Sequence, residues 1–113
     1  MIPKMENPGA TNSEQLTGKQ LRFLRGLGHH LSAKVIIGRQ GITDHLIASV
    51  EAMLIADELI KMKIGSTGEV DRQQAAAIIA ERTGACFVQV LGKTILLYRE
   101  NRNKKAAKKI HLP

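Results

Sequence analysis

Hydrophobic positions recur along this chain with two spacings, one typical of helices and one typical of strands. Thr17 and Gln20 fit a capping box, in which each side chain satisfies a free backbone N–H group of the other, and leucines follow at helical spacing. This pattern predicts a first helix from about Gly18 to Gly28. Three basic residues of this helix are spaced three positions apart, so they lie on the side of the helix away from the leucines: Lys19, Arg22 and Arg25.

The next part of the chain alternates between strand and helix patterns. Lys34–Ile37 is a short β-branched run that predicts a buried strand, and it ends at the segment Gly38–Gly41. Apolar residues from Leu46 to Leu54 have helical spacing and predict a second helix that begins after Thr43. Leu59–Ile64 alternates apolar residues with lysines, which predicts a strand with one face in the core and a cationic opposite face.

A third helix and a hairpin are predicted for the last part of the chain. Asp71 and Gln74 fit a second capping box, and Gly84 stands where a left-handed helix C-cap is expected. Two strands follow, on either side of a two-residue turn at Gly92 and Lys93: Cys86–Leu91 and Thr94–Tyr98.

These elements occur in the order α-β-α-β-α-β-β. Strand–helix–strand connections favour parallel neighbours and the hairpin adds an antiparallel pair, so the predicted fold class is α/β, with one four-stranded mixed sheet packed with three helices. A length of 113 residues suits one domain. We expect residues 1–15 to be a disordered N-terminal arm, 16–98 the folded domain and 99–113 a basic C-terminal tail.

The charge of the chain indicates a class of partner. Its 17 lysines and arginines stand against 10 acids, and the net charge of +7 favours a polyanionic partner. Most of the excess lies beyond Tyr98, in a tail that we interpret as an auxiliary contact, or else a solubilising end, that folding does not need. Within the body, the stretch from Gln15 to Thr43 has no acid, which predicts a basic face.

The loop Gly38–Gly41, with the sequence GRQG, is the candidate binding site. A glycine at each end allows close approach of a ligand, and the following helix directs free N–H groups and its positive end to the same place. A GxxG loop clamps backbone nucleotides in KH-type RNA binders, although this spacing also occurs in turns that bind nothing. Because Arg39 is in the loop and the flanks lack acids, we predict an RNA contact formed by Gly38, Arg39, Gln40, Gly41, Lys19, Arg22, Arg25 and Lys34.

Other kinds of site have little support in the sequence. His29 and His30 lack further ligands at metal spacing, so no metal is expected, and Cys86 is the only cysteine and is interpreted as a small core residue. There is no GxSxG motif, P-loop or pair of carboxylates in apolar sequence, so we expect no enzyme, cofactor or small-molecule substrate. The three aromatics, among them Phe87 in a core strand, are too few for a base-stacking platform, so contact should run mainly through the RNA backbone.

The location of the protein is predicted from what its sequence does not contain. No apolar run approaches the length of a membrane span, and residues 1–15 have neither the apolar stretch of a secretory signal nor the composition of a transit peptide. We therefore expect a cytoplasmic protein without membrane contact.

Several separated segments of the chain resemble the YhbY family, the single-domain bacterial form of the CRM (chloroplast RNA splicing and ribosome maturation) domain. The resemblance runs from Leu16 to about Pro113 and departs from the family pattern at Gly28 and His30, where alanine and proline are expected. The matching segments are LTGKQLRFLRGLGHHL (16–31), KVIIGRQGIT (34–43), ELIKMKIG (58–65), RTGACFVQVLGKTILLYRE (82–100) and the terminal IHLP.

The resemblance implies a fold similar to the C-terminal domain of bacterial translation initiation factor three, association with precursors of the large ribosomal subunit, and a role in ribosome assembly. Residues 16–98 would then form a CRM-type RNA-binding domain. The family's RNA-facing loop falls on Gly38–Gly41, supported by the basic residues of the first helix. Whether Lys61 and Lys63 lie on a covered or an open face of the sheet stays undecided at this point.

Our leading hypothesis is a monomeric, non-enzymatic factor that binds structured ribosomal RNA during large-subunit assembly. An alternative is a ribosome-associated protein-interaction adaptor without direct RNA recognition, whose basic face only offsets ribosomal charge. A third possibility, an enzyme acting on RNA, has no residues to recommend it.

Overall fold

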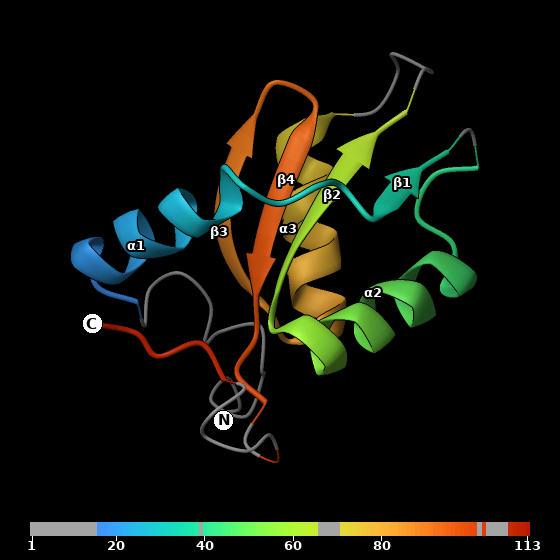
Figure 1. The fold of residues 1–113 in the computed structure, drawn as a ribbon. Coiled ribbons are helices and arrows are strands. Elements are labelled where there is room, and N and C mark those ends of the chain that lie inside the picture. Colours follow the sequence, from blue (N-terminus) through green and yellow to red (C-terminus); the bar gives the residue numbers. More distant parts are fainter. Residues whose placement is uncertain (1–15, 39, 66–70, 102, 104–108) are drawn as a thin grey trace, which may run out of the picture.

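A computed structural model describes residues 16–38, 40–65, 71–101, 103 and 109–113 (Figure 1). The order of elements agrees with the predicted one, and so do most of their boundaries. The helices are α1 (Gly18–Gly28), α2 (Asp44–Asp57) and α3 (Arg72–Thr83), and the strands are β1 (Val35–Ile37), β2 (Leu59–Ile64), β3 (Cys86–Leu91) and β4 (Thr94–Tyr98).

Local capping explains where the helices begin and end. Both halves of the Thr17–Gln20 capping box are formed, each with a donor–acceptor distance of 3.0 Å. Asp71 caps α3 by accepting hydrogen bonds from the backbone N–H groups of residues 73 and 74. Gly84 ends the same helix in the left-handed region, with a φ of 71°, which a glycine adopts without steric cost.

The sheet has the strand order β1-β2-β4-β3. β1 and β2 are parallel neighbours, and β3 and β4 form the predicted antiparallel hairpin. β2 and β3, which α3 connects, also run in the same direction. They are not neighbours, because β4 lies between them and pairs antiparallel with both. β1 and β3 are therefore the two edges of the sheet.

Helices cover both faces of the sheet, and each face has its own hydrophobic cluster. The larger cluster lies between the sheet and the pair α2 and α3, and it includes Leu54, Met62 and Ile79. The smaller cluster lies on the opposite face, where Leu24 of α1 packs with Leu96 and other residues of the sheet. Figure 1 shows α1 on one side of the sheet, and α2 and α3 on the other.

The prediction that the first strand is buried holds for only one of its faces. Val35 and Ile37 are buried in the larger cluster, whereas Ile36 between them is 61% exposed. The reason is that α1 packs against β2, β3 and β4, so the α1 side of the sheet is left uncovered at the β1 edge. This open part of the sheet was not visible in the hydrophobic pattern.

The chain beyond β4 packs against the body wherever it is described. Arg99 pairs with Glu51 on α2, with 2.8 Å between Nη1 and Oε1. Ile110 and Leu112 pack against the smaller cluster, next to α1. We expected that folding would not need this tail, and these contacts make that expectation one to test by deletion.

Candidate functional site

The Gly38–Gly41 loop leaves the end of β1 and turns the chain towards α2. Gly41 donates its backbone N–H to the carbonyl of Gly38, with 3.0 Å between N and O, and has a φ of 75°. Thr43 then caps α2, its hydroxyl accepting the backbone N–H of Leu46 at 3.0 Å. Arg39, a predicted site residue, lies outside the described residues.

The two glycines of the loop have different reasons to be glycines. Gly41 adopts a left-handed conformation that residues with a side chain rarely adopt. Gly38 has no positive φ, and a Cβ added there would meet no atom of the described residues within 4 Å, so neither the backbone conformation nor the packing of this part of the chain requires a glycine. The space in front of Gly38 is open, and a ligand could approach the backbone there closely.

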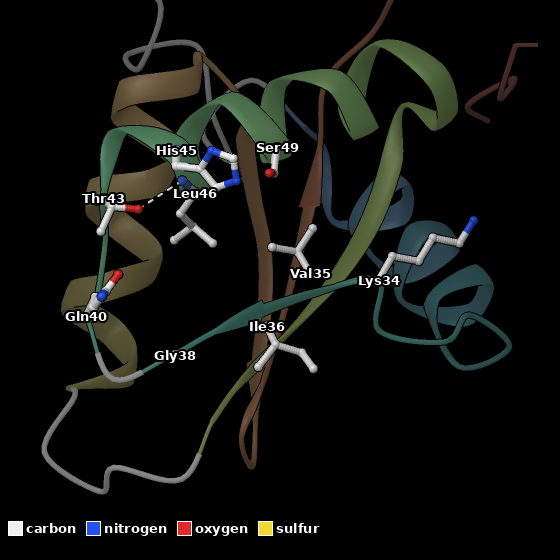
Figure 2. Close-up of a pocket in the computed structure, with 10 residues that line it drawn as sticks. Lys34, Val35, Ile36, Gly38, Gln40, Thr43, His45, Leu46 and Ser49 are labelled. Carbon is white, nitrogen blue, oxygen red and sulfur yellow. Dashed lines mark hydrogen bonds between the residues drawn. The ribbon is translucent and has the colours of Figure 1, made fainter.

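An open groove of about 620 Å³ lies beside this loop (Figure 2). One wall is the outer edge of β1, and the other is the first two turns of α2. Gln40 lines the groove at the loop, His45 and Ser49 line it on α2, and Lys34 lines it at the opposite end of β1. Val35, Ile36 and Leu46 add apolar surface, so the groove has both polar and apolar walls and ends in the glycine loop.

Two acids near the groove reduce its positive charge. Lys34 is paired with Asp57 at 3.4 Å, and both side chains are partly exposed. Asp44, in the first turn of α2, is almost fully exposed and pairs with Arg82 at 2.8 Å. Exposed pairs of this kind are weak, so both cations remain available to an anionic ligand.

The predicted basic residues of α1 form a second cationic surface. Lys19 and Arg22 are exposed and Arg25 is partly buried. Phe23, 38% exposed, lies one helical turn after Lys19 and so shares its side of the helix. Gly26 is also exposed, and a Cβ added there would meet nothing within 4 Å, so this side of α1 is open to close approach.

The structure separates this helix from the loop. Figure 1 shows α1 over the β3–β4 side of the sheet, while the Gly38–Gly41 loop lies beyond β1. Between α1 and the loop lies β2, and two of its lysines point to the face of the sheet that α1 covers. Lys63 is exposed and Lys61 is partly buried beside Gly28 and His29, at the C-terminal end of α1.

The remaining candidates do not form a reactive centre. Within the described ranges, no group of three or more His, Cys, Asp or Glu side chains could hold a metal ion. Burial raises the pKa of the Cys86 thiol to about 11, so it is a protonated, partly buried packing residue and not a thiolate nucleophile. None of the helices that the structure describes combines the length and the apolar character of a membrane span.

Comparison with known proteins places this geometry in a family. The model of the CRS1 / YhbY (CRM) domain matches residues 16–99. The chain is 38% identical over 98 residues to the Bacillus subtilis protein named "Probable RNA-binding protein YqeI", covering 87% of this chain and 99% of that protein. It is 37% identical to a Haemophilus influenzae protein named "RNA-binding protein", covering 80% and 91% of the two chains.

A solved structure has the same fold. The solution structure of protein SAV1595 from Staphylococcus aureus superposes with a TM-score of 0.72, at 37% sequence identity, covering 87% of this chain and 99% of that one. The three helices and the four-stranded mixed sheet are thus a shared α/β architecture. Because the family model matches residues 16–99, this chain belongs to the CRS1 / YhbY (CRM) domain family.

Proposed function

We propose that this protein binds RNA as a non-enzymatic factor, and that it holds the RNA backbone at the Gly38–Gly41 loop. Membership of the CRM domain family and the names of the bacterial relatives support RNA as the ligand. We choose this loop as the site because of Gly38. Neither its backbone conformation nor the packing around it requires a residue without a side chain. Approach of a phosphate to the backbone would explain it.

The chemistry of this contact is electrostatic. The loop precedes the N-terminus of α2, whose first-turn N–H groups carry partial positive charge and suit a phosphate oxygen. Lys34 and His45 can contact the same strand of RNA in the groove. Arg39 adds a charge within the loop sequence and would release counterions when it neutralises a phosphate.

The separation of the loop from α1 favours a structured RNA over a short one. Lys19 and Arg22 belong to α1, which packs on β2, β3 and β4, whereas the loop lies beyond the β1 edge, so one RNA has to extend across the sheet to reach both. A folded ribosomal RNA segment meets this requirement. We therefore propose that the cytoplasmic role of the protein is assembly of the large ribosomal subunit, as the family resemblance implies.

Substitutions at Gly38 test the loop without disturbing the fold. Gly38→Ala should leave the protein as stable as wild type or slightly more stable, since alanine narrows the unfolded ensemble and fits the space. Gly38→Asp should weaken binding to a structured ribosomal RNA fragment by more than tenfold, an order-of-magnitude estimate for a carboxylate facing a phosphate. Fluorescence anisotropy over a range of salt concentrations measures both the affinity and its salt dependence.

Arg39 supplies a matched pair of variants for the charge itself. Arg39→Gln should lower the slope of log affinity against log salt by about one, while Arg39→Lys keeps the charge and should keep the slope. If Gly38→Asp and Arg39→Gln both bind like wild type, the loop is not the contact. If the wild type co-sediments with ribosomal particles but binds no free RNA, the adaptor alternative replaces the proposal.

A further inference from the structure

Four side chains form a row across one end of the sheet, and we name it the outer row. Ile36 of β1 pairs with Lys63 of β2, Lys63 pairs with Thr94 of β4, and Thr94 pairs with Leu91 of β3. Residues that pair across strands point to the same face of a sheet, so these four side chains lie side by side.

The outer row faces the side of the sheet that α1 covers only in part. Met62, next to Lys63 in β2, points to the α2–α3 side and is buried in the larger cluster, so Lys63 points the other way. α1 ends at Gly28, which packs on Leu96, and Leu96 pairs with Lys61 in the neighbouring row. The helix therefore stops one row short of the outer row.

This lack of cover exposes two large aliphatic side chains. Ile36 is 61% exposed and Leu91 is 58% exposed, and they stand at the two ends of the row, on the two edge strands. Lys63 between them is exposed and Thr94 is partly buried, its hydroxyl donating to the Leu91 carbonyl at 2.7 Å. Single exposed aliphatics are common, but here two stand at the ends of one row that also contains a lysine.

The outer row is continuous with the Gly38–Gly41 loop. Both lie at the same end of the sheet, because the loop leaves β1 two residues after Ile36. Gly65, at the end of β2, brings the strand close to this corner: a Cβ added there would be 3.5 Å from a methyl carbon of Ile36. Within the four strands, the charged residues are Lys61 and Lys63, with no acid.

We propose that the outer row is a second RNA contact, which binds unpaired nucleotides of the RNA whose backbone lies at the loop. This inference rests on the proposed function and adds to it a preference for RNA with unpaired nucleotides. Ile36 and Leu91 contact bases or riboses, whose apolar surface is accessible only where the bases are not stacked in a duplex. Lys63 neutralises the phosphate between them.

The charge of this surface favours RNA over a protein partner. Lysines are depleted at the centre of protein interfaces, and here a lysine occupies the middle of the row and another the row behind it. The chain as a whole carries a net charge of +7, which attracts a polyanion and repels basic partners.

The test compares two RNAs and a matched pair of variants of the full chain. One RNA is a fully paired hairpin, and the other is the same hairpin with an internal loop of unpaired nucleotides. The double variant Ile36→Thr/Leu91→Thr keeps strand-favouring residues and should weaken binding to the looped RNA about five- to tenfold, with little change for the paired one. Ile55→Thr is the control, because Ile55 is 54% exposed but lies on α2, outside the row.

Lys63→Gln and Lys63→Arg complete the design. The first should lower the salt slope by about one for the looped RNA, and the second should leave it unchanged. The inference is overturned if the double variant binds the looped RNA like wild type, if it weakens both RNAs equally, or if Ile55→Thr has the same effect. If Gly38→Asp still weakens binding by more than tenfold in that case, the proposed function stands. A wild type that binds neither RNA rejects both proposals.

Discussion

The carboxylate of Glu58 accepts a hydrogen bond from the backbone N–H of Ile110, with 2.8 Å between Oε1 and N. Its other oxygen accepts the backbone N–H of Asn101, also at 2.8 Å, and the side chain is fully buried. Glu58 is also the residue between α2 and β2, and it has a φ of 65°. One buried carboxylate therefore attaches two separate points of the C-terminal segment to the body.

Replacing this carboxylate should destabilise the fold. In Glu58→Gln, one oxygen becomes an NH₂ donor that faces a backbone N–H, so at least one of the two hydrogen bonds is lost in a buried site. We expect the free energy of unfolding to fall by about 2–4 kcal/mol. Urea denaturation followed by circular dichroism measures this, with Glu81→Gln as the exposed control, expected within about 0.5 kcal/mol of wild type. Equal stability of the two variants would show that Glu58 does not hold the segment.

The end of the chain should contribute to stability through its apolar residues. Deletion of residues 109–113 removes Ile110 and Leu112 from the smaller cluster. It also takes two partners from the Glu58 carboxylate, the backbone N–H of Ile110 and the ammonium group of Lys109, which lies 3.9 Å from Oε2. We expect a loss of about 2–4 kcal/mol from the two aliphatic side chains. An unchanged urea midpoint for the shortened chain would mean that these contacts add nothing.

The basic residues of the same segment can be tested without removing its packing. Replacement of Lys104, Lys105 and Lys108 by glutamine leaves Ile110 and Leu112 in the sequence. If the segment is an auxiliary RNA contact, affinity falls and the salt slope decreases by up to about three. A purely solubilising segment predicts the wild-type affinity and slope.

Local signals made most of the fold predictable. The caps at Thr17 and Asp71, the left-handed Gly84 and the alternation in Leu59–Ile64 each depend on neighbours in sequence, and the structure has all four. The position of α1 was not predictable in this way, because the face of the sheet that it covers depends on contacts between residues far apart in the chain. The exposure of Ile36 follows from that position.

The candidate site was predictable only in part, for the same reason. The loop at Gly38–Gly41 and the basic residues of α1 could be named from the sequence, but the sheet between them could not. The acid-free stretch from Gln15 to Thr43 suggested one basic face, whereas the helix lies over β3 and β4 and the loop lies beyond the β1 edge. Glu58 gave no signal at all, since a glutamate between a helix and a strand usually lies at the surface.

Gly28 and Leu96 should show strong energetic coupling. An ideal Cβ at position 28 would be 2.6 Å from one methyl carbon of Leu96 and 2.9 Å from the other, so the leucine occupies the space that an alanine would need. Gly28→Ala should therefore destabilise by about 1–2 kcal/mol through overpacking, less any gain in helix propensity. Leu96→Val should cost about 1 kcal/mol through a small cavity.

The double variant distinguishes this explanation from two independent effects. In Gly28→Ala/Leu96→Val the added methyl group fills the space that the shorter side chain leaves, so its stability should exceed the sum of the single changes by about 1 kcal/mol or more. Additive free energies of unfolding would instead show that the two positions adapt separately. The coupling would also explain why this chain has glycine where its family resemblance leads one to expect alanine.

Stability should fall at alkaline pH through a partly buried thiol, Cys86, and a buried phenol, Tyr98. Burial raises the pKa of Cys86 from its ordinary value of 9.0 to about 11. Burial, helped by the negative charges of Glu58 and Glu100, raises the pKa of Tyr98 from 10.0 to about 12. The unfolded chain releases these protons first, so the stabilisation from these groups is complete below about pH 9 and is lost as the pH rises towards 11 and 12.

Variants at these two positions isolate the contribution of the thiol and of the phenol. Cys86→Ala and Tyr98→Phe cannot release a proton, so each should lose less stability than wild type between pH 8 and pH 10.5, whatever its stability at pH 8. Urea denaturation at both pH values gives the difference for each protein. A wild type that loses no more stability than Tyr98→Phe would show that the phenol of Tyr98 is not protected in the folded state. The same result for Cys86→Ala would place the thiol in contact with water, where alkylating reagents should then modify it readily at neutral pH.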